Sequence, residues 1–139
     1  MDHETDYRWR DRHSENPLDR VQPVVTKDEL LQLIQEARTV EANDRIFDYV
    51  TTLAEATRTH PMVELGVSPR GALALCRMAK AHAFLAGRDF VVPEDVAAVF
   101  PDVCAHRLIL SAKARMMEEK AENILSEILK SVDMPVLKA

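Results

Sequence analysis

The chain has 139 residues, of which 47% are apolar and 29% charged, and its formal net charge is −5. This balance is typical of one globular domain that can bury its own core, and the acidic total argues against a dedicated nucleic-acid-binding protein. No apolar run approaches the roughly 18 residues of a membrane-spanning helix, and the charged N-terminus is unlike a signal peptide. Only three residues are glycine, whereas helix-forming Ala, Leu, Glu and Arg are abundant, so the composition predicts an all-α domain.

Residues 1–23 are predicted to be a lead-in without a stable fold of their own, because they are polar and contain two prolines. Tyr7 and Trp9 are the only aromatic residues in this stretch. We therefore interpret residues 1–23 as a linker and residues 24–139 as a helical domain. Because a fold rarely begins with such a segment, we expect the chain to be part of a longer protein.

Two helices are predicted between residues 26 and 60. Thr26 is a strong N-cap, and Glu29 three residues later completes a capping box. The apolar residues that follow share one helical face: Leu30, Leu33, Ile34 and Ala37. The second helix begins at Asn43, a good cap, and Pro61 should end it. Its apolar stripe consists of Ile46, Phe47, Val50, Leu53 and Ala54.

A third helix is predicted from Ser68, a strong N-cap, to Gly87, a suitable C-terminal cap. Pro69 fits its first position, where no N–H is needed. Apolar residues almost encircle this helix. Its only charged residues are Arg70, Arg77 and Lys80. We therefore expect most of it to be buried as the central helix of the domain.

The pattern after the third helix is less regular. "FVV" predicts a short extended piece, and Pro93 with two acidic residues after it opens a fourth helix, for which Val92 is a poor cap. Pro101 should end or kink that helix, with a short fifth helix through residues 103–106. "HRLIL" is ambiguous between helix and extended chain. A last helix within residues 112–132 is closed by Pro135. Its predicted packing face is Met117, Ala121, Ile124, Leu125, Ile128 and Val132.

Cysteine and histidine give no clear reactive or metal site. Cys76 and Cys104 each lie among apolar residues, so we interpret them as buried thiols, with a disulfide or a catalytic thiol as the alternatives. The five histidines form no H-x-x-x-H or H-E-x-x-H pair. The sequence therefore indicates no zinc site.

The stretch "LGVSPRGALAL" resembles half of a phosphate loop, because four residues separate Gly66 from Gly71. A working phosphate loop needs lysine and then Ser or Thr after the second glycine. Here Ala72 and Leu73 occupy those positions, and the preceding residues form a helix cap. The stretch is therefore not a phosphate loop, and we do not expect the chain to hydrolyse a nucleotide by itself.

Arg70 is nevertheless well placed for an anion. It is the second residue of a capped helix, where the first N–H groups and the helix dipole favour negative charge. A guanidinium adds a permanent charge and a planar fork that matches phosphate oxygens. The alternative is a surface arginine that pairs with Glu64 or Asp95.

Four motifs in order carry a resemblance to a known family: "NPLDRVQPV", "LGVSPRGALAL", "GRDFVVPEDV" and "HRLIL". Together they resemble the C-terminal lid of the MoxR family of AAA+ ATPases, over residues 15–111 and more loosely through the last helix. The resemblance implies a bundle of about five to six helices over a nucleotide that a separate α/β core binds. It also implies that Arg70 is the second sensor, which contacts the γ-phosphate from a helix start supported by Ser68 and Pro69.

The same resemblance implies properties of a larger parent protein. The parent would hydrolyse ATP with Mg²⁺, whereas the isolated chain would bind neither. Its partners would be the AAA+ core of the same polypeptide and the neighbouring subunits of a hexameric ring. The family suggests a cytoplasmic chaperone that matures client complexes, often beside von Willebrand A domain proteins.

Three features depart from the family pattern. Gly71 stands where the family commonly has alanine, and Val92 replaces a hydroxyl cap. "MMEEKAENI" lacks a glycine-containing turn, so we expect the last helix to run longer than in the family. None of these features touches Arg70.

Two other functions remain open from the residues alone. A helical nucleic-acid-binding module would use the basic residues Arg8, Arg10, Arg12, Arg70, Arg77, Lys80 and Arg88. The acidic total and the lack of a basic helical face disfavour it. A standalone interaction module would use Tyr7 and Trp9 as anchors.

Overall fold

The computed structural model describes residues 16–137, which fall into two compact units, one ending at Gln32 and the other beginning at Leu33. Several residues singled out in the sequence lie outside the described part: Tyr7, Arg8, Trp9, Arg10 and Arg12. The roles suggested for these residues, like the boundary at residue 24, stay predictions.

The first unit contains a 3-10 turn, η1 (Pro17–Arg20), and the start of helix α2 (Lys27–Thr39). The predicted capping box is present, because the Thr26 N–H donates to Glu29 Oε2 at 2.7 Å and the Glu29 N–H donates to Thr26 Oγ1 at 3.1 Å. No residue of α2 is buried. The helix is therefore set by its cap and propensity rather than by a buried face.

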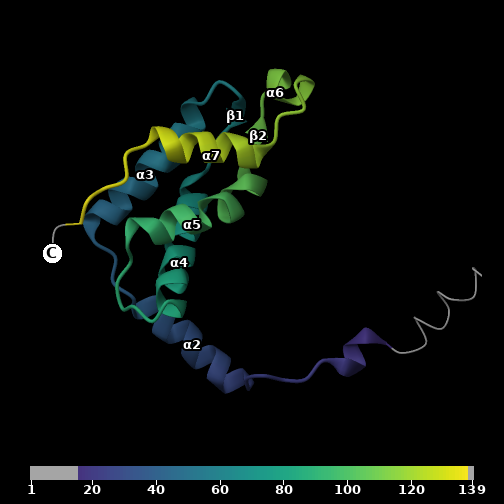
Figure 1. The fold of residues 1–139 in the computed structure, drawn as a ribbon, viewed down its shortest axis with the longest axis vertical. Helices are drawn as coiled ribbons and strands as arrows, with labels where there is room; N and C mark the ends of the chain where they lie inside the picture. The colour runs from purple at the N-terminus through teal and green to yellow at the C-terminus, as the bar shows by residue number, and fades with distance from the viewer. Residues whose placement is uncertain (1–15, 138–139) are drawn as a thin grey trace, which may run out of the picture. The chain divides into compact units, whose positions relative to one another are not determined.

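The second unit is helical, which confirms the predicted fold class. Its elements in chain order are α3 (Asp44–Thr59), β1 (Val63–Leu65), α4 (Pro69–Leu85), α5 (Pro93–Cys104), the 3-10 turn η2 (Ala105–Arg107), β2 (Ile109–Leu110), α6 (Ala112–Met116) and α7 (Ala121–Ser131). Helix α5 lies between α4 and α7 and packs against both, while α3 contacts all three (Figure 1).

Extended chain is limited to short pieces. β1 and β2 pair antiparallel, with Val63 opposite Leu110 and Leu65 opposite Ile109. The predicted "FVV" segment forms an isolated parallel bridge between Phe90 and Glu41. Each pairing joins two segments that connect helices: β1 with β2, and Glu41 with Phe90.

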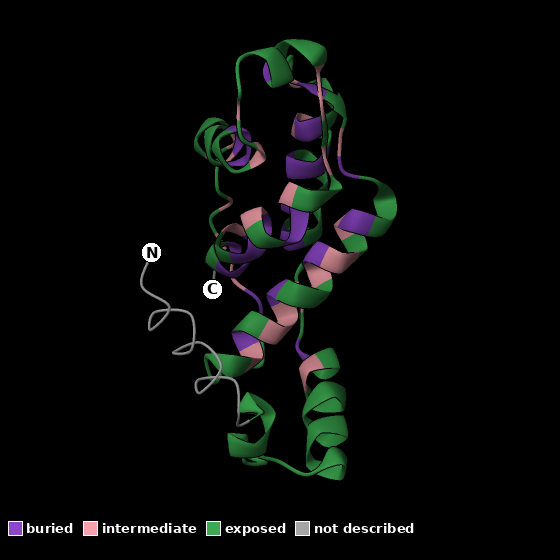
Figure 2. Ribbon diagram, turned by 90° about the vertical axis from the view of Figure 1, so that its right-hand side faces the viewer, coloured by how far each residue is buried: buried purple, intermediate pink, exposed green. Residues whose placement is uncertain are grey.

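The core lies where the inner faces of α3, α4, α5 and α7 meet, as the buried segments in Figure 2 show. Its largest fully buried apolar side chains are Phe100, Ile46, Leu53, Leu75, Ile124 and Leu125. Two of these, Ile46 and Leu53, belong to the stripe predicted for the second helix. The apolar residues at helical spacing therefore correctly predicted which face of α3 packs in the core.

Helix α4 is less buried than its composition predicts. Its buried residues are Gly71, Leu75, Ala79 and Ala83, which follow one another at four-residue spacing. Leu73 is 59% exposed and Leu85 is 84% exposed. The expectation of a largely buried helix was therefore wrong, because α3 and α5 cover only the face that its four buried residues form. Both ends of α4 agree with prediction, and Gly87 adopts φ +77 beyond the last turn.

The sequence predicted that Pro101 would end or kink α5. The helix does not end there but continues to Cys104, and the 3-10 turn η2 follows. The proline ring removes one helical hydrogen bond. Phe100, Val103 and Cys104 around it are buried, so their packing holds the helix across the missing bond. The short fifth helix predicted over residues 103–106 corresponds only to η2, which begins at Ala105.

The last predicted helix is two helices, α6 and α7, separated by a turn. Met117 begins this turn and is 59% exposed, so its assignment to the packing face was wrong. The sequence predicted a longer last helix because the segment before it contains no glycine for a turn. The turn forms nevertheless, since Glu118 adopts the left-handed conformation at φ +54. That conformation costs a non-glycine residue about 1 kcal/mol. Ile124, Leu125 and Ile128 of α7 are buried as predicted.

Candidate functional site

The start of α4 has the local geometry that its sequence predicts. Ser68 is extended, with φ −73 and ψ 164, and its Oγ accepts a hydrogen bond from the Gly71 N–H at 3.2 Å. Pro69 occupies the first helical position. The serine therefore satisfies one first-turn donor, and the proline removes another.

Arg70 follows Pro69 and its side chain is exposed. Within the described residues it makes no hydrogen bond or ion pair. The two carboxylates that could have paired with it are engaged elsewhere. Oε2 of Glu64 lies 3.9 Å from Nη1 of Arg115, and the Asp95 carboxylate pairs with Arg88. The alternative of a surface pair with either acid is therefore not what the structure shows.

A second arginine stem lies beside the first turn of α4. A Cβ built on Gly71 would lie 3.2 Å from Arg107 Cδ and 2.7 Å from Val67 Cγ1. The Arg107 Nε–H donates to the carbonyl oxygen of Val103 at 3.0 Å. The departure from alanine at position 71 thus has a steric reason in this chain, because Val67 and Arg107 fill the space that a methyl group would take.

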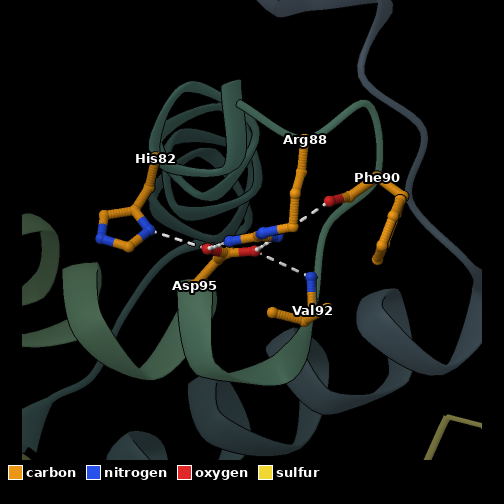
Figure 3. Close-up of polar contacts among 5 residues, drawn as sticks. All are labelled: His82, Arg88, Phe90, Val92 and Asp95. Carbon is orange, nitrogen blue, oxygen red and sulfur yellow. Dashed lines mark hydrogen bonds and ion pairs between the residues drawn. The ribbon is translucent and has the colours of Figure 1, made fainter. Parts of the chain in front are cut away.

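The other end of α4 carries a network of charged side chains around Asp95, which is 1% exposed (Figure 3). Arg88 donates two hydrogen bonds to its carboxylate, from Nη1 to Oδ2 at 2.7 Å and from Nη2 to Oδ1 at 2.6 Å. His82 Nδ1 lies 2.7 Å from Oδ1, and the Val92 N–H donates to Oδ2 at 2.8 Å. The network joins the end of α4 to the start of α5.

This network also explains how α5 begins without a hydroxyl cap. Burial raises the pKa of Asp95, but the hydrogen bonds from Arg88, Val92 and His82 outweigh that effect and lower it to about 2. Asp95 is therefore ionised at neutral pH, at a helix start where the dipole favours a negative charge. Sequence reasoning noted the acidic first turn but missed its partners. The sequence signal for this ion pair was Arg88, which lies seven residues before Asp95 with an extended segment between them.

A groove of about 710 Å³ runs along the exposed face of α4. Leu73 and Arg77 follow Arg70 on this face at helical spacing, and they line the groove together with Lys80. Ile34 and Arg38 from the end of α2 form its other wall. The face of α4 that carries Arg70 is thus apolar and basic rather than acidic.

The described residues offer no reactive thiol or metal centre. Cys76 and Cys104 are free, and burial raises the pKa of both thiols, that of Cys104 to about 11. Residues 16–137 contain no group of three or more His, Cys, Asp or Glu side chains that could hold a metal ion. Every helix within residues 16–137 is too short or too polar to span a bilayer.

Residues 55–128, which contain both Arg70 and Asp95, match the AAA lid domain family. The chain belongs to this family. The chain is 38% identical over 124 residues to the uncharacterized protein YeaC of Bacillus subtilis. It is 32% identical over 125 residues to the Chaperone MoxR1 of Mycobacterium tuberculosis. These matches cover 89% and 84% of the chain, so the predicted resemblance to MoxR-type lids is confirmed.

A solved structure has the same fold. The chain matches the crystal structure of a candidate ATPase from Cytophaga hutchinsonii with a TM-score of 0.78 and 30% identity, over 98% of its length. The matched region is 44% of that structure, and it is 39% of YeaC and 33% of MoxR1. The chain thus spans less than half the length of these relatives.

Proposed function

We propose that this lid closes over ATP held by a separate AAA+ core and that Arg70 contacts the γ-phosphate. The observation that carries the proposal is the state of Arg70, which is exposed and has no partner within the described residues. The positive charge of an arginine at a helix start interacts unfavourably with the helix dipole, and a negatively charged ligand would offset this unfavourable interaction. The membership of the AAA lid family supplies the expected source of that charge.

The chemistry of this helix start fits a phosphate group. Ser68 fixes the first turn, so the direction in which Arg70 leaves the helix is set before a ligand arrives. The guanidinium fork donates to phosphate oxygens, and its charge stabilises the negative charge on the phosphoryl group during transfer. Because the arginine comes from the lid, this stabilisation would exist only when the lid is closed.

Other parts of the reaction would come from outside this chain. We propose that the core binds ATP with Mg²⁺ and that neighbouring subunits complete a hexameric ring. We also propose that the ATPase is a cytoplasmic chaperone that matures client complexes and acts beside von Willebrand A domain proteins. The name of Chaperone MoxR1 supports the chaperone part of this proposal.

The test is Arg70→Ala in the full-length ATPase. ATP turnover should fall by about 10- to 100-fold, because a hydrogen bond to a charged group contributes about 1.5–3 kcal/mol. Lys130→Ala, which removes an exposed cation of α7 outside the candidate site, is the control and should stay within about twofold. The thermal unfolding of both variants should match that of the wild type. Unchanged turnover in Arg70→Ala would remove the proposed role.

A further inference from the structure

The loop that leads into α4 is held by the last turn of α3. Thr57 is fully buried, and its Oγ1 accepts a hydrogen bond from the Val67 N–H at 2.9 Å while donating to the Ala54 carbonyl oxygen at 2.6 Å. The neighbouring Arg58 donates from Nε to the Val67 carbonyl oxygen at 2.9 Å. Two consecutive side chains of α3 therefore occupy both backbone polar groups of one loop residue.

The approach of this loop to α3 is close enough to require glycine. A Cβ built on Gly66 would lie 2.7 Å from the backbone N and Cα of Arg58 and from Thr57 Oγ1. Backbone atoms cannot move aside for it without shifting the helix. Gly66 thus lets the loop lie directly on α3, and the hydrogen bonds to Val67 fix it there.

Little freedom remains between this contact and Arg70. Val67 is 1% exposed, so it is also held by packing. Ser68 is fixed by its cap, and the ring of Pro69 fixes its φ angle. The position of Val67 on α3 therefore sets where α4 starts and from which point the Arg70 side chain extends.

We propose that Thr57 and Arg58 are positioning residues for Arg70. They hold the start of α4 against α3, so that the guanidinium keeps one position relative to the rest of the lid as the lid closes. This inference rests on the proposed function of Arg70. It adds that the loop between α3 and α4 is part of the nucleotide-sensing machinery, although neither residue needs to touch the nucleotide.

The first experiment measures the contact itself, in the isolated chain. Thr57→Val keeps the shape of the side chain but leaves the buried Val67 N–H without its acceptor. We expect hydrogen exchange at the Val67 amide to become at least about tenfold faster. Thr57→Ser keeps the hydroxyl and should exchange like the wild type. Thr51→Val is the matched control, because Thr51 donates only to the Phe47 carbonyl oxygen of its own helix. Unchanged exchange at Val67 in Thr57→Val would overturn the inference.

The second experiment is a double-mutant cycle on ATP turnover in the full-length ATPase. Thr57→Val should lower kcat/KM for ATP by about tenfold when Arg70 is present, because small misplacements of a catalytic group are costly. In the Arg70→Ala background the same change should cost less than about twofold. Thr57→Ser should restore turnover, which a simple change in side-chain volume would not do.

The outcomes separate the two proposals. If Arg70→Ala alone has no effect, the proposed function fails, whatever Thr57→Val does. If Arg70→Ala lowers turnover but Thr57→Val costs the same with and without Arg70, the positioning role fails while the function stands. Should Thr57→Val not fold, Arg58→Met takes its place in the cycle, since Arg58 is exposed and its loss removes only the bond to the Val67 carbonyl.

Discussion

The two ends of α4 each carry an arginine, and the two side chains are used in opposite ways. Arg88, just beyond the C-terminal end, donates to a buried carboxylate and to the Phe90 carbonyl oxygen. Arg70, in the first turn, has no partner among residues 16–137. The same functional group is therefore a structural element at one end of the helix and an available cation at the other.

This difference teaches how to tell the two kinds of arginine apart. Asp95 is buried and ionised, and it needs several donors around it, so Arg88 is fixed by the fold. Arg70 stands where the helix dipole disfavours it and no carboxylate pairs with it. An arginine that the fold leaves uncompensated in an unfavourable place is the better candidate for a ligand contact. It also follows that Arg88 is not free to form part of a basic nucleic-acid-binding face.

The largest expected effect tests the structural end of the helix. Asp95→Ala removes the carboxylate that pairs with Arg88 and accepts from the Val92 N–H, so the free energy of unfolding should fall by about 3 kcal/mol. Urea unfolding of the isolated chain measures it. Asp102→Ala, on the exposed side of the same helix, should change the free energy of unfolding by less than about 0.5 kcal/mol. A loss below about 1 kcal/mol in Asp95→Ala would mean that the network contributes little to the fold.

A smaller effect is expected when pH rather than mutation removes the charge. The pKa of Asp95 is about 2 in the folded state, below its ordinary value of 3.8. A lowered pKa contributes stability that is complete above about pH 4 and is lost as the pH falls toward 2. The contribution is about 2 kcal/mol. This contribution can be isolated by measuring the unfolding free energies of the wild type and of Asp95→Asn, which does not titrate at position 95. The difference between the two proteins should shrink as the pH falls from 4 to 2. A constant difference over that range would contradict the assignment.

The smallest effect concerns the N-terminal end of α4. Gly71→Ala gains helix propensity but places a methyl group against Val67, so we expect a net loss of about 1 kcal/mol in unfolding free energy. Val67→Ala alone leaves a cavity and should also destabilise. In the double variant the methyl group of residue 71 occupies part of the space left by the two γ-methyl groups of Val67, so the variant should recover part of the loss. Additive losses measured by thermal unfolding would show that the two positions do not share space.

Much of the fold could be predicted from local signals. The caps at Thr26, Asn43 and Ser68 were correct, because each depends on residues within one turn. The errors arose where distant packing overrode local preference. Pro101 stays inside α5 because buried neighbours hold the helix, and Glu118 takes a glycine-like conformation that no local pattern indicates.

The candidate site shows the same division. Arg70 could be identified from its position after Ser68 and Pro69, and the family resemblance added its expected role. Thr57 and Arg58 could not be identified, because a threonine within a helix usually bonds to its own helix, as Thr51 does. Their role depends on a loop ten residues further along the chain that returns to α3.

The pairing of β1 with β2 has a consequence for the order of folding. These strands lie roughly 45 residues apart in the sequence, and both α4 and α5 are made between them. Local helices can form within microseconds, whereas contacts between distant segments wait until the intervening chain is organised. The β1–β2 pair therefore forms late, once the chain as far as Ile109 is organised, whereas the contacts of Val67 with α3 span only about ten residues and do not depend on β2.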